Sequence, residues 1–358
     1  MVGLQMLYNI DKRLKEIKGS NEPFGGVSLI LMGDFAQLPP VKDKPLYATK
    51  VGDMNEFQLH GSNLFKHFMD KGKTIIFDEI MRQQGESQKR FKEVLNCLAD
   101  GSFDKAGWLY LKERDLYLSD KFNNETRKDF LATSTLITST NRVAKDYNCR
   151  RIKQLGADIA PVKSQNNCPQ AANASFSKAG LHNSILLAKG CDVLITTNLW
   201  KEVGLTNGAK RKVKYIIYAE GEKPPMLPRI VIVEVEQYTG PGYMGFEKCV
   251  PITPIRREWF EGGKVCERWM LPLNLGYGIT IHKSQGMSMD KVIIDIGNRE
   301  FACGLTYTAI SRCRRIEDLA FYPFRNYDRF WRIFGNSIFK ERRMQDKKEF
   351  KSDFEFQC

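Results

Sequence analysis

The sequence has few of the residues that hold metal ions or disulfide frameworks. Its 358 residues include nine cysteines and four histidines, and no two cysteines form a C-x-x-C pair. Zinc sites and disulfide-rich miniproteins depend on such clusters, so we expect neither. No run of eighteen apolar residues and no basic start before a long apolar segment is present. We therefore predict neither a membrane span nor a signal peptide. Scattered cysteines favour a reducing compartment.

A P-loop is also missing. The single Gly-Lys-Thr stands at residues 72–74, but the first glycine of G-x-x-x-x-G-K-[ST] would have to occupy the position of His67. The residues that follow, 75–79 (IIFDE), resemble a strand that carries magnesium-binding acids. That strand begins directly after Gly-Lys-Thr and leaves no room for the helix of a P-loop. We interpret the Gly-Lys-Thr as a chance match.

The chain has an excess of positive charge. Lys and Arg number 55 against 42 Asp and Glu, which gives a net charge of +13 and a pI near 9.2. A polyanion is the first partner to consider, although a merely soluble basic surface would have the same composition.

The hydrophobic pattern predicts an α/β fold. Apolar residues at helical spacing predict a helix over 2–18, ended by Gly19. The apolar run VSLILM (27–32) predicts a strand buried on both faces, as in a parallel sheet. Strand-and-loop patterns recur at 134–140, before a helix at 141–155, and at 291–296.

A β-rich segment interrupts this pattern. The runs 193–196, 212–220 and 229–236 are typical of strands and are separated by Gly, Pro and Asn. We predict a small β-barrel inserted into the α/β domain.

Two polar stretches lie beyond the first predicted strands. GDFAQLPPV (33–41) places Asp34 and Gln37 on a loop made rigid by two prolines, where a phosphate could be sensed. Asp34 could instead simply cap the next segment. In FDEIMRQQGE (77–86), Arg82 could pair with a phosphate through its guanidinium fork, or be an ordinary surface arginine.

Two further stretches lie near the end of the chain. Residues 271–297 hold a short polar turn that ends at Gly286, and its hydroxyl, ammonium and N–H donors suit a phosphate of a nucleotide or of a nucleic acid. LTYTAISRCRR (305–315) mounts Arg312 at a short helix, as an arginine finger requires. The alternative is a basic helix end that complements the helix dipole.

In this order and spacing, the four stretches resemble the PIF-like (petite integration frequency) DNA helicases of superfamily one, which include Helitron helicases. Residues 136–148, 190–213 and 307–312 also resemble segments of that family. The resemblance covers nearly the whole chain. GDFAQLPPV and HKSQG are its specific motifs, and E-x-x-R-Q is a weaker one.

The resemblance implies an α/β fold with two RecA-like (P-loop NTPase type) domains of parallel sheets and an SH3-like β insertion in the second. Residues 1–72 would be a remnant of the first domain. The second domain would comprise 73–187 and 273–340, the insertion 188–272, and a charged tail 341–358.

The resemblance also implies ATP and Mg²⁺ as cofactors. Gln37 would contact the γ-phosphate, and Asp34 would help hold the magnesium and its water shell, with no direct metal ligand in this chain. Arg82 and Arg312 would stabilise transition-state charge, and such an arginine can be worth ~10³ to 10⁵ in rate.

The implied partner is single-stranded or forked DNA. Residues expected to hold its backbone are Thr140, Asn141, Thr280, His282, Lys283 and Ser284. Gln285 and Gly286 would lie nearer the nucleotide. Tyr277, Trp200 and Trp259 could stack on bases or pack in the protein interior.

The implied function is an ATP-dependent 5′-to-3′ DNA helicase of DNA repair, recombination and genome maintenance. The nucleus is the expected compartment, with the mitochondrion or cytoplasm as alternatives. In the family, the magnesium-binding acids precede a Met-Val like Met1-Val2, so we expect this chain to lack the P-loop and the N-terminal half of the first RecA-like domain. Two alternatives remain open: a non-catalytic module that binds single-stranded DNA, and a transposon relic.

We predict that the chain as given does not hydrolyse ATP, because it has no P-loop to hold the phosphates. A phosphate-release assay with and without single-stranded DNA checks this. DNA-stimulated hydrolysis by the pure chain would contradict it.

Overall fold

The structure is a computed structural model that describes residues 1–48, 50–69, 74–75, 77, 79–235, 238, 245 and 247–331. The chain forms two compact units. Unit 1 comprises the described residues of 1–134 and 284–331, and unit 2 comprises those of 135–283. Within these ranges, no helix combines the length and apolar character needed to cross a membrane. The predicted tail, 341–358, lies outside the described residues.

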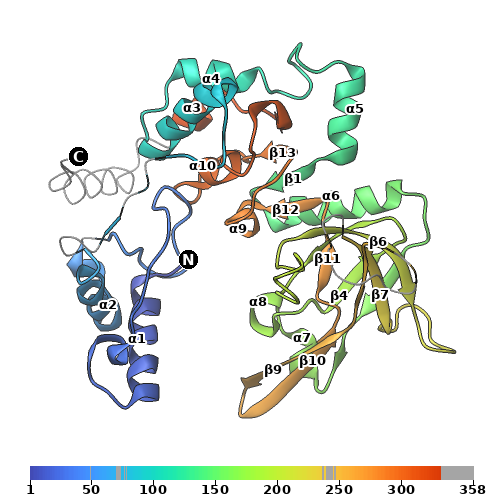
Figure 1. The fold of residues 1–358 in the computed structure, drawn as a ribbon, viewed down its shortest axis with the longest axis horizontal. Helices are drawn as coiled ribbons and strands as arrows, with labels where there is room; N and C mark the ends of the chain where they lie inside the picture. Colours follow the sequence, from blue (N-terminus) through green and yellow to red (C-terminus); the bar gives the residue numbers. More distant parts are fainter. Residues whose placement is uncertain are drawn as a thin grey trace. The chain divides into compact units, whose positions relative to one another are not determined.

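Unit 1 begins with two packed helices. The predicted first helix is confirmed as α1 (Leu4–Lys18), which ends at Gly19 in the left-handed region (φ 60°). α2 (Glu56–Lys66) begins with a capping box at Asn55 and packs against α1 (Figure 1). Leu7 of α1 and Phe65 of α2 form a small core with Phe24, which follows α1.

The strand predicted at 27–32 is wrong. This segment has no strand hydrogen bonding in the structure. Leu29 and Leu31 pack against the small core, while the alternate side chains of Ile30 and Met32 are 86% and 87% exposed. An apolar run becomes a buried strand only where neighbouring strands satisfy its N–H and C=O groups, and no described segment pairs with this one. One face of the segment is therefore uncovered.

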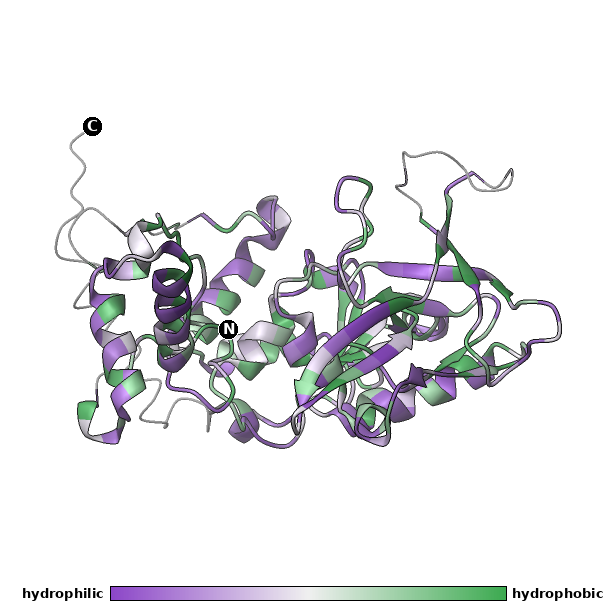
Figure 2. Ribbon diagram, turned by 90° about the horizontal axis from the view of Figure 1, so that it is seen from below, coloured by the Kyte–Doolittle hydropathy of each residue, from purple (hydrophilic) through white to green (hydrophobic). Residues whose placement is uncertain are grey.

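The rest of unit 1 is helical around one pair of parallel strands. β13 (Val292–Asp295) pairs with β14 (Leu319–Phe321), with Val292 opposite Leu319. The strand predicted at 291–296 is confirmed. The helices are α3 (Lys89–Asp100), α4 (Lys105–Lys112), α5 (Asn124–Thr133), α10 (Leu305–Ile310) and α11 (Tyr327–Trp331). The longer ones, α3, α4 and α5, carry both polar and apolar residues, as amphipathic helices do (Figure 2). The shorter 3₁₀ segments are η1 (Pro23–Gly26), η2 (Val51–Asp53), η3 (Glu86–Gln88) and η4 (Ile316–Asp318).

Unit 2 contains the second pair of parallel strands. β1 (Thr135–Thr138) pairs with β12 (Gly278–Thr280), and α6 (Asn141–Gln154) packs against both. The Asn148 side chain both donates to the Gly278 carbonyl and accepts from the Gly278 N–H, each at 2.8 Å. The predicted strand at 134–140 and helix at 141–155 are thus confirmed.

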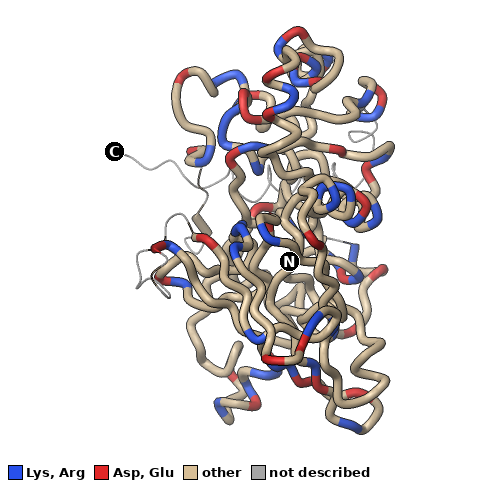
Figure 3. The backbone as a smooth tube through the Cα atoms, turned by 90° about the vertical axis from the view of Figure 1, so that its right-hand side faces the viewer, with Lys and Arg blue, Asp and Glu red and all other residues tan. Residues whose placement is uncertain are grey.

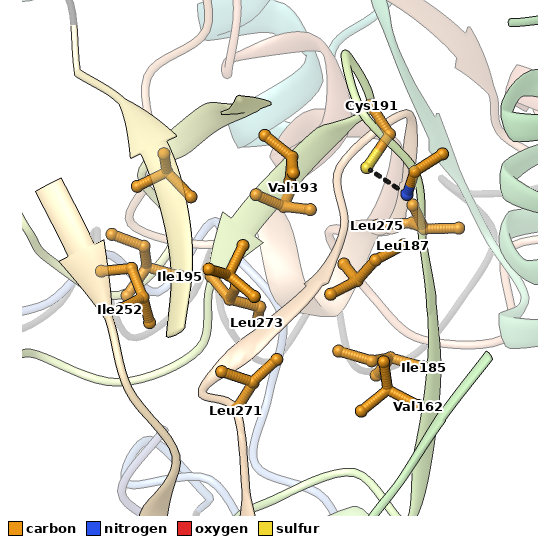
Figure 4. Packing of buried hydrophobic residues seen from close by; sticks show 14 of the residues in the cluster. Val162, Ile185, Leu187, Cys191, Val193, Ile195, Ile252, Leu271, Leu273 and Leu275 are labelled. Atoms are coloured by element: carbon orange, nitrogen blue, oxygen red, sulfur yellow. Dashed lines mark hydrogen bonds between the residues drawn. The ribbon is translucent and has the colours of Figure 1, made fainter. Parts of the chain in front are cut away.

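The predicted β-rich insertion forms antiparallel sheets. The largest has the order β11-β5-β6-β7-β8. Its strands are β5 (Asp192–Ile195), β6 (Lys210–Ile217), β7 (Ile230–Glu234), β8 (Cys249–Ile252) and β11 (Leu273–Leu275). Side chains of these strands meet those of β2 (Ala160–Lys163) and β4 (Ser184–Leu187) in one apolar core, part of which Figure 4 shows.

A second antiparallel sheet, of order β3-β10-β9, completes unit 2. It consists of β3 (Gln165–Asn166), β9 (Ile255–Glu261) and β10 (Lys264–Met270). The fully buried Arg268 of β10 donates to the carbonyls of Leu181 at 2.7 Å and Ala174 at 3.0 Å. This guanidinium fastens β10 to the segment that holds α7 (Pro169–Asn173) and α8 (Phe176–Ala179).

The α/β class with parallel strands and an antiparallel β insertion is therefore confirmed. The compact units divide the chain after residues 134 and 283. The domain boundaries proposed from sequence, at 72, 187, 272 and 340, stay predictions.

We predict that Ile30→Lys combined with Met32→Lys lowers aggregation without lowering stability. Both side chains are exposed, so their replacement should change the free energy of unfolding by less than about 0.5 kcal/mol. The charges also disfavour pairing of the uncovered segment with another chain. Light scattering and urea unfolding check the two effects. Leu7→Ala, in the small core, should instead cost about 2–5 kcal/mol. Unchanged scattering of the double variant would contradict the prediction.

Candidate nucleotide and nucleic-acid sites

Asp34 organises the loop 33–41 in unit 1. Its Oδ1 accepts from the Ala36 N–H at 2.8 Å, so the capping alternative describes part of what it does. Its Oδ2 accepts from the Gln37 side-chain amide and from the Tyr307 hydroxyl, each at 3.1 Å. Asp34 is exposed, so the carboxylate also faces solvent. The sequence-predicted pair Asp34 and Gln37 is thus joined to α10 through a residue that the sequence did not single out.

α10 can approach this loop because a glycine precedes it. Gly304 adopts φ 81°, and a Cβ there would collide with the carbonyl oxygens of Ala36 and Gln37. Any other residue would be strained in its backbone and would push the loop away. Burial and the neighbouring Asp34 raise the pKa of Tyr307, so its hydroxyl stays protonated and donates to the carboxylate.

Arg82 and Gln83 fasten the segment 79–88 to the residues that follow α10. The Arg82 guanidinium donates to the Ser288 hydroxyl at 2.8 Å and to the Ser311 carbonyl at 3.0 Å. Gln83 is buried and donates to the Cys313 carbonyl at 2.6 Å. Arg82 is therefore held in place and is not a freely moving surface arginine.

Arg312 lies beside Arg82. Arg312 is 1% exposed, and its guanidinium donates to the Thr308 carbonyl at 2.8 Å and the Met287 carbonyl at 3.3 Å. Burial and the positive charge of Arg82 lower the pKa of Arg312 to about 10. Within the described part of the chain, neither arginine is joined to a carboxylate by an ion pair. Two neighbouring cations without such a partner favour an anion between or beside them.

Gln285 and Gly286 belong to the same unit. Gln285 is half-buried, and Gly286 is exposed with φ 81° in the turn closed by the bond from Met287 N–H to the Ser284 carbonyl. This turn leads directly to Met287 and Ser288, which contact the two arginines. All six residues predicted for the nucleotide therefore lie in unit 1.

The residues predicted for DNA lie mainly in unit 2. Thr138 of β1 is opposite Thr280 of β12, so the carboxyl ends of the two parallel strands share one edge. Thr140 then caps α6 by accepting from the Val143 N–H at 3.4 Å, and Asn141 is its first residue. Thr140 and Asn141 are both exposed. The start of a 14-residue helix with no acid in its first turn is suited to an anionic backbone.

The turn after β12 begins with a short helix, α9 (Ile281–Ser284). Lys283 is exposed, but nearby protein atoms partly desolvate its ammonium and lower its pKa. Burial also lowers the pKa of the half-buried His282. Thr280 is 6% exposed and Ser284 is fully buried, so neither hydroxyl is at the surface. Direct DNA contacts from these two residues stay predictions.

Sequence reasoning missed three aromatic residues near these groups. They are Tyr307, which bonds Asp34, and the stacked pair Phe176 and His182, of which Phe176 contacts Lys283. Tyr307 stands in the motif LTYTAISR, which could have drawn attention to it. Nothing in the sequence marks Phe176 and His182. Tyr277, a sequence candidate for base stacking, is 3% exposed and belongs to the unit 2 core.

Known proteins share this sequence pattern. A family model described as PIF1-like helicase matches residues 1–106. The ATP-dependent DNA helicase PIF1 of Xenopus laevis is 29% identical over 326 residues, which cover 90% of this chain and 45% of the relative. The protein of the same name from Homo sapiens is 27% identical over 328 residues. This chain is therefore similar to PIF1-like helicases over about 90% of its length.

Solved structures of PIF1-like helicases have a similar fold. The Pif1 helicase of Candida albicans has a TM-score of 0.65 at 22% identity and covers 94% of this chain. A Bacteroides Pif1 helicase in complex with ADP-AlF3 and single-stranded DNA has a TM-score of 0.62 at 20% identity and covers 97%. The chain spans about half the length of the curated relatives that it matches, at 45% for the first of them.

We predict that Gln83→Ala destabilises unit 1, whereas Gln84→Ala does not. Gln83 is 2% exposed, and its loss leaves the buried Cys313 carbonyl without this donor, at a cost of about 1–3 kcal/mol. Its neighbour Gln84 is exposed and serves as the matched control. Urea unfolding measures both, and equal stabilities of the two variants would contradict the prediction.

Proposed function

We propose that this PIF1-like chain is the part of an ATP-dependent 5′-to-3′ DNA helicase that senses the γ-phosphate and holds single-stranded DNA. The proposal is supported chiefly by Arg82 and Arg312, two neighbouring guanidinium groups without a carboxylate ion-pair partner among the described residues. Such a pair is stabilised when a phosphate comes near.

The residues of unit 1 fit a nucleotide phosphate. Arg82 would bind the γ-phosphate, and Arg312 would add positive charge beside it. Because Arg312 is buried, it would reach the phosphate directly only if its present hydrogen bonds were broken. Gln37 would orient the attacking water, and Asp34 would hold water of a magnesium shell through its exposed carboxylate. MgATP, when bound, would supply the phosphoanhydride whose hydrolysis drives movement. Tyr307 would keep Asp34 oriented by its hydrogen bond.

The DNA contacts are expected to involve backbone rather than bases. Thr140, Asn141 and Lys283 are exposed donors at one strand edge, and donors of this kind serve phosphates without reading sequence. Lysines and arginines are spread along the chain among acidic residues, so no single basic block accounts for the net charge (Figure 3). Local geometry at the strand edge therefore has to select the DNA path.

The finer features of the proposal come from the family resemblance. These are the RecA-like character of the parallel strands β1, β12, β13 and β14, all of which lie in the predicted second RecA-like domain, the SH3-like character of the antiparallel insertion, forked DNA as a substrate, and work in DNA repair and recombination in the nucleus. ATP hydrolysis would also require a segment with a P-loop, which in the proposed helicase would precede the residues of this chain.

We predict that low millimolar phosphate stabilises unit 1 through the arginine pair. An anion that binds the folded state and not the unfolded state stabilises the fold. The Tm should rise by about 2–4 °C for each kcal/mol of stabilisation. Arg82→Gln should abolish the shift, and Arg312→Lys, which keeps the charge, should retain part of it. Thermal melts at fixed ionic strength measure the effect.

The control for the phosphate experiment is Arg90→Gln. Arg90 is an exposed arginine of α3 that already pairs with Glu93 at 2.9 Å. The same phosphate shift in the parent and in Arg82→Gln would contradict the anion site.

We predict that the chain binds oligo(dT) with an affinity that falls steeply as salt rises. For single strands the slope of log K against log salt is about −0.7 per phosphate neutralised, so Lys283→Ala should reduce it by roughly 0.7 to 1. Lys214→Ala is the control, because Lys214 pairs with Glu234 at 3.0 Å. Fluorescence anisotropy at four salt concentrations measures the slopes. The absence of binding at low salt would overturn the proposed function.

A further inference from the structure

Phe176 and His182 form an aromatic pair in unit 2. Phe176 begins α8, and the His182 ring stacks on it with centroids 4.4 Å apart and an angle of 25° between the planes. Both side chains are half-buried. The His182 Nε2 is buried without a hydrogen-bond partner among the described residues. The imidazole therefore contributes as a flat apolar surface that fixes the orientation of the Phe176 ring.

Lys283 lies over this pair. Its Nζ is 5.3 Å from the Phe176 centroid, within the range of a cation–π interaction. A charged imidazole would repel the ammonium. However, burial and the charges of Lys283 and Arg268 lower the pKa of His182 to about 4, so the ring is neutral near pH 7. Lys283 has no ion-pair partner within the described ranges, so its charge is not neutralised.

We propose that Phe176 is a positioning residue for DNA binding, which holds the Lys283 ammonium at the strand edge where the phosphate backbone would pass. His182 supports the Phe176 ring by stacking on it. The part of the inference that concerns DNA rests on the proposed function. The part that concerns the contact of Phe176 with Lys283 rests on the structure of the aromatic pair alone.

Two physical effects make this arrangement useful. A lysine side chain loses much rotamer freedom when it binds a phosphate, and the ring restricts that freedom before DNA arrives. The ring also covers one side of the ammonium, and a charge with fewer water neighbours attracts a phosphate more strongly. Neither effect needs base recognition, as expected for a contact that must tolerate any sequence.

The first experiment tests the pair without DNA. The lysines of the full chain are reductively ¹³C-methylated, and the Lys283 methyl signal is assigned from its loss in Lys283→Arg. A ring lying beneath the amine should shift this signal upfield in the parent and in Phe176→Tyr, and the shift should vanish in Phe176→Leu. The same signal position in parent and Phe176→Leu overturns the inference.

The second experiment measures oligo(dT) affinity by anisotropy. Phe176→Leu should weaken binding about two- to fivefold, the range that a partly exposed cation–π contact accounts for. Phe176→Tyr, which keeps the ring, should bind like the parent. Adding Phe176→Leu to Lys283→Ala should cause no further loss, because the ring then has no ammonium to hold.

Two control variants match these changes. Phe260→Leu makes the same substitution at an exposed phenylalanine of β9, and Lys178→Ala removes a lysine of α8 that pairs with Glu261. Neither should change affinity more than about 1.5-fold. An equal loss from Phe176→Leu with and without Lys283 overturns the inference while leaving the proposed function intact. A parent chain that binds no oligo(dT) overturns the proposed function together with the part of the inference that concerns DNA.

Discussion

The close approach of Arg82 and Arg312 is the constraint on which the arrangement of unit 1 depends. Two like charges are kept together because Arg82 donates to the Ser311 carbonyl, beside Arg312, and Gln83 anchors the same turn through Cys313. A segment some 230 residues away in sequence is thereby fixed to the end of α10. Gly304 lets the start of α10 approach the loop of Asp34, so one short helix connects all the groups proposed to sense a phosphate.

The chain itself joins the two proposed sites. Thr280, His282 and Lys283 follow β12 in unit 2, and within three further residues Gln285 and Gly286 lead to the contacts of the arginine pair in unit 1. A displacement of Lys283 by DNA would therefore pull on a turn that ends at Met287, whose carbonyl accepts from Arg312. This covalent path is the physical basis that we propose for coupling between DNA and nucleotide.

Much of this fold follows from local sequence patterns, because α1, β1, α6 and β13 each have a clear period or a capping residue. The strand predicted at 27–32 was wrong, since an apolar run does not reveal whether a pairing neighbour exists. Asp34, Gln37 and Arg82 were candidates because of their place beyond predicted strands, and their specific roles came from the motif resemblance. Tyr307, Gln83 and Phe176 could not be assigned their contacts from sequence, because their partners lie from 100 to more than 270 residues away or depend on tertiary packing.

The central claim is that the arginine pair serves a nucleotide phosphate during DNA-dependent hydrolysis. Its most direct test joins this chain to the segment that precedes the matched region in the Xenopus laevis relative and measures single-stranded-DNA-stimulated ATPase activity. The account predicts activity in the chimera, and a loss on the order of 10³-fold in kcat with unchanged DNA affinity when Arg82 or Arg312 is replaced by Ala. An active chimera that keeps its kcat without both arginines would contradict it.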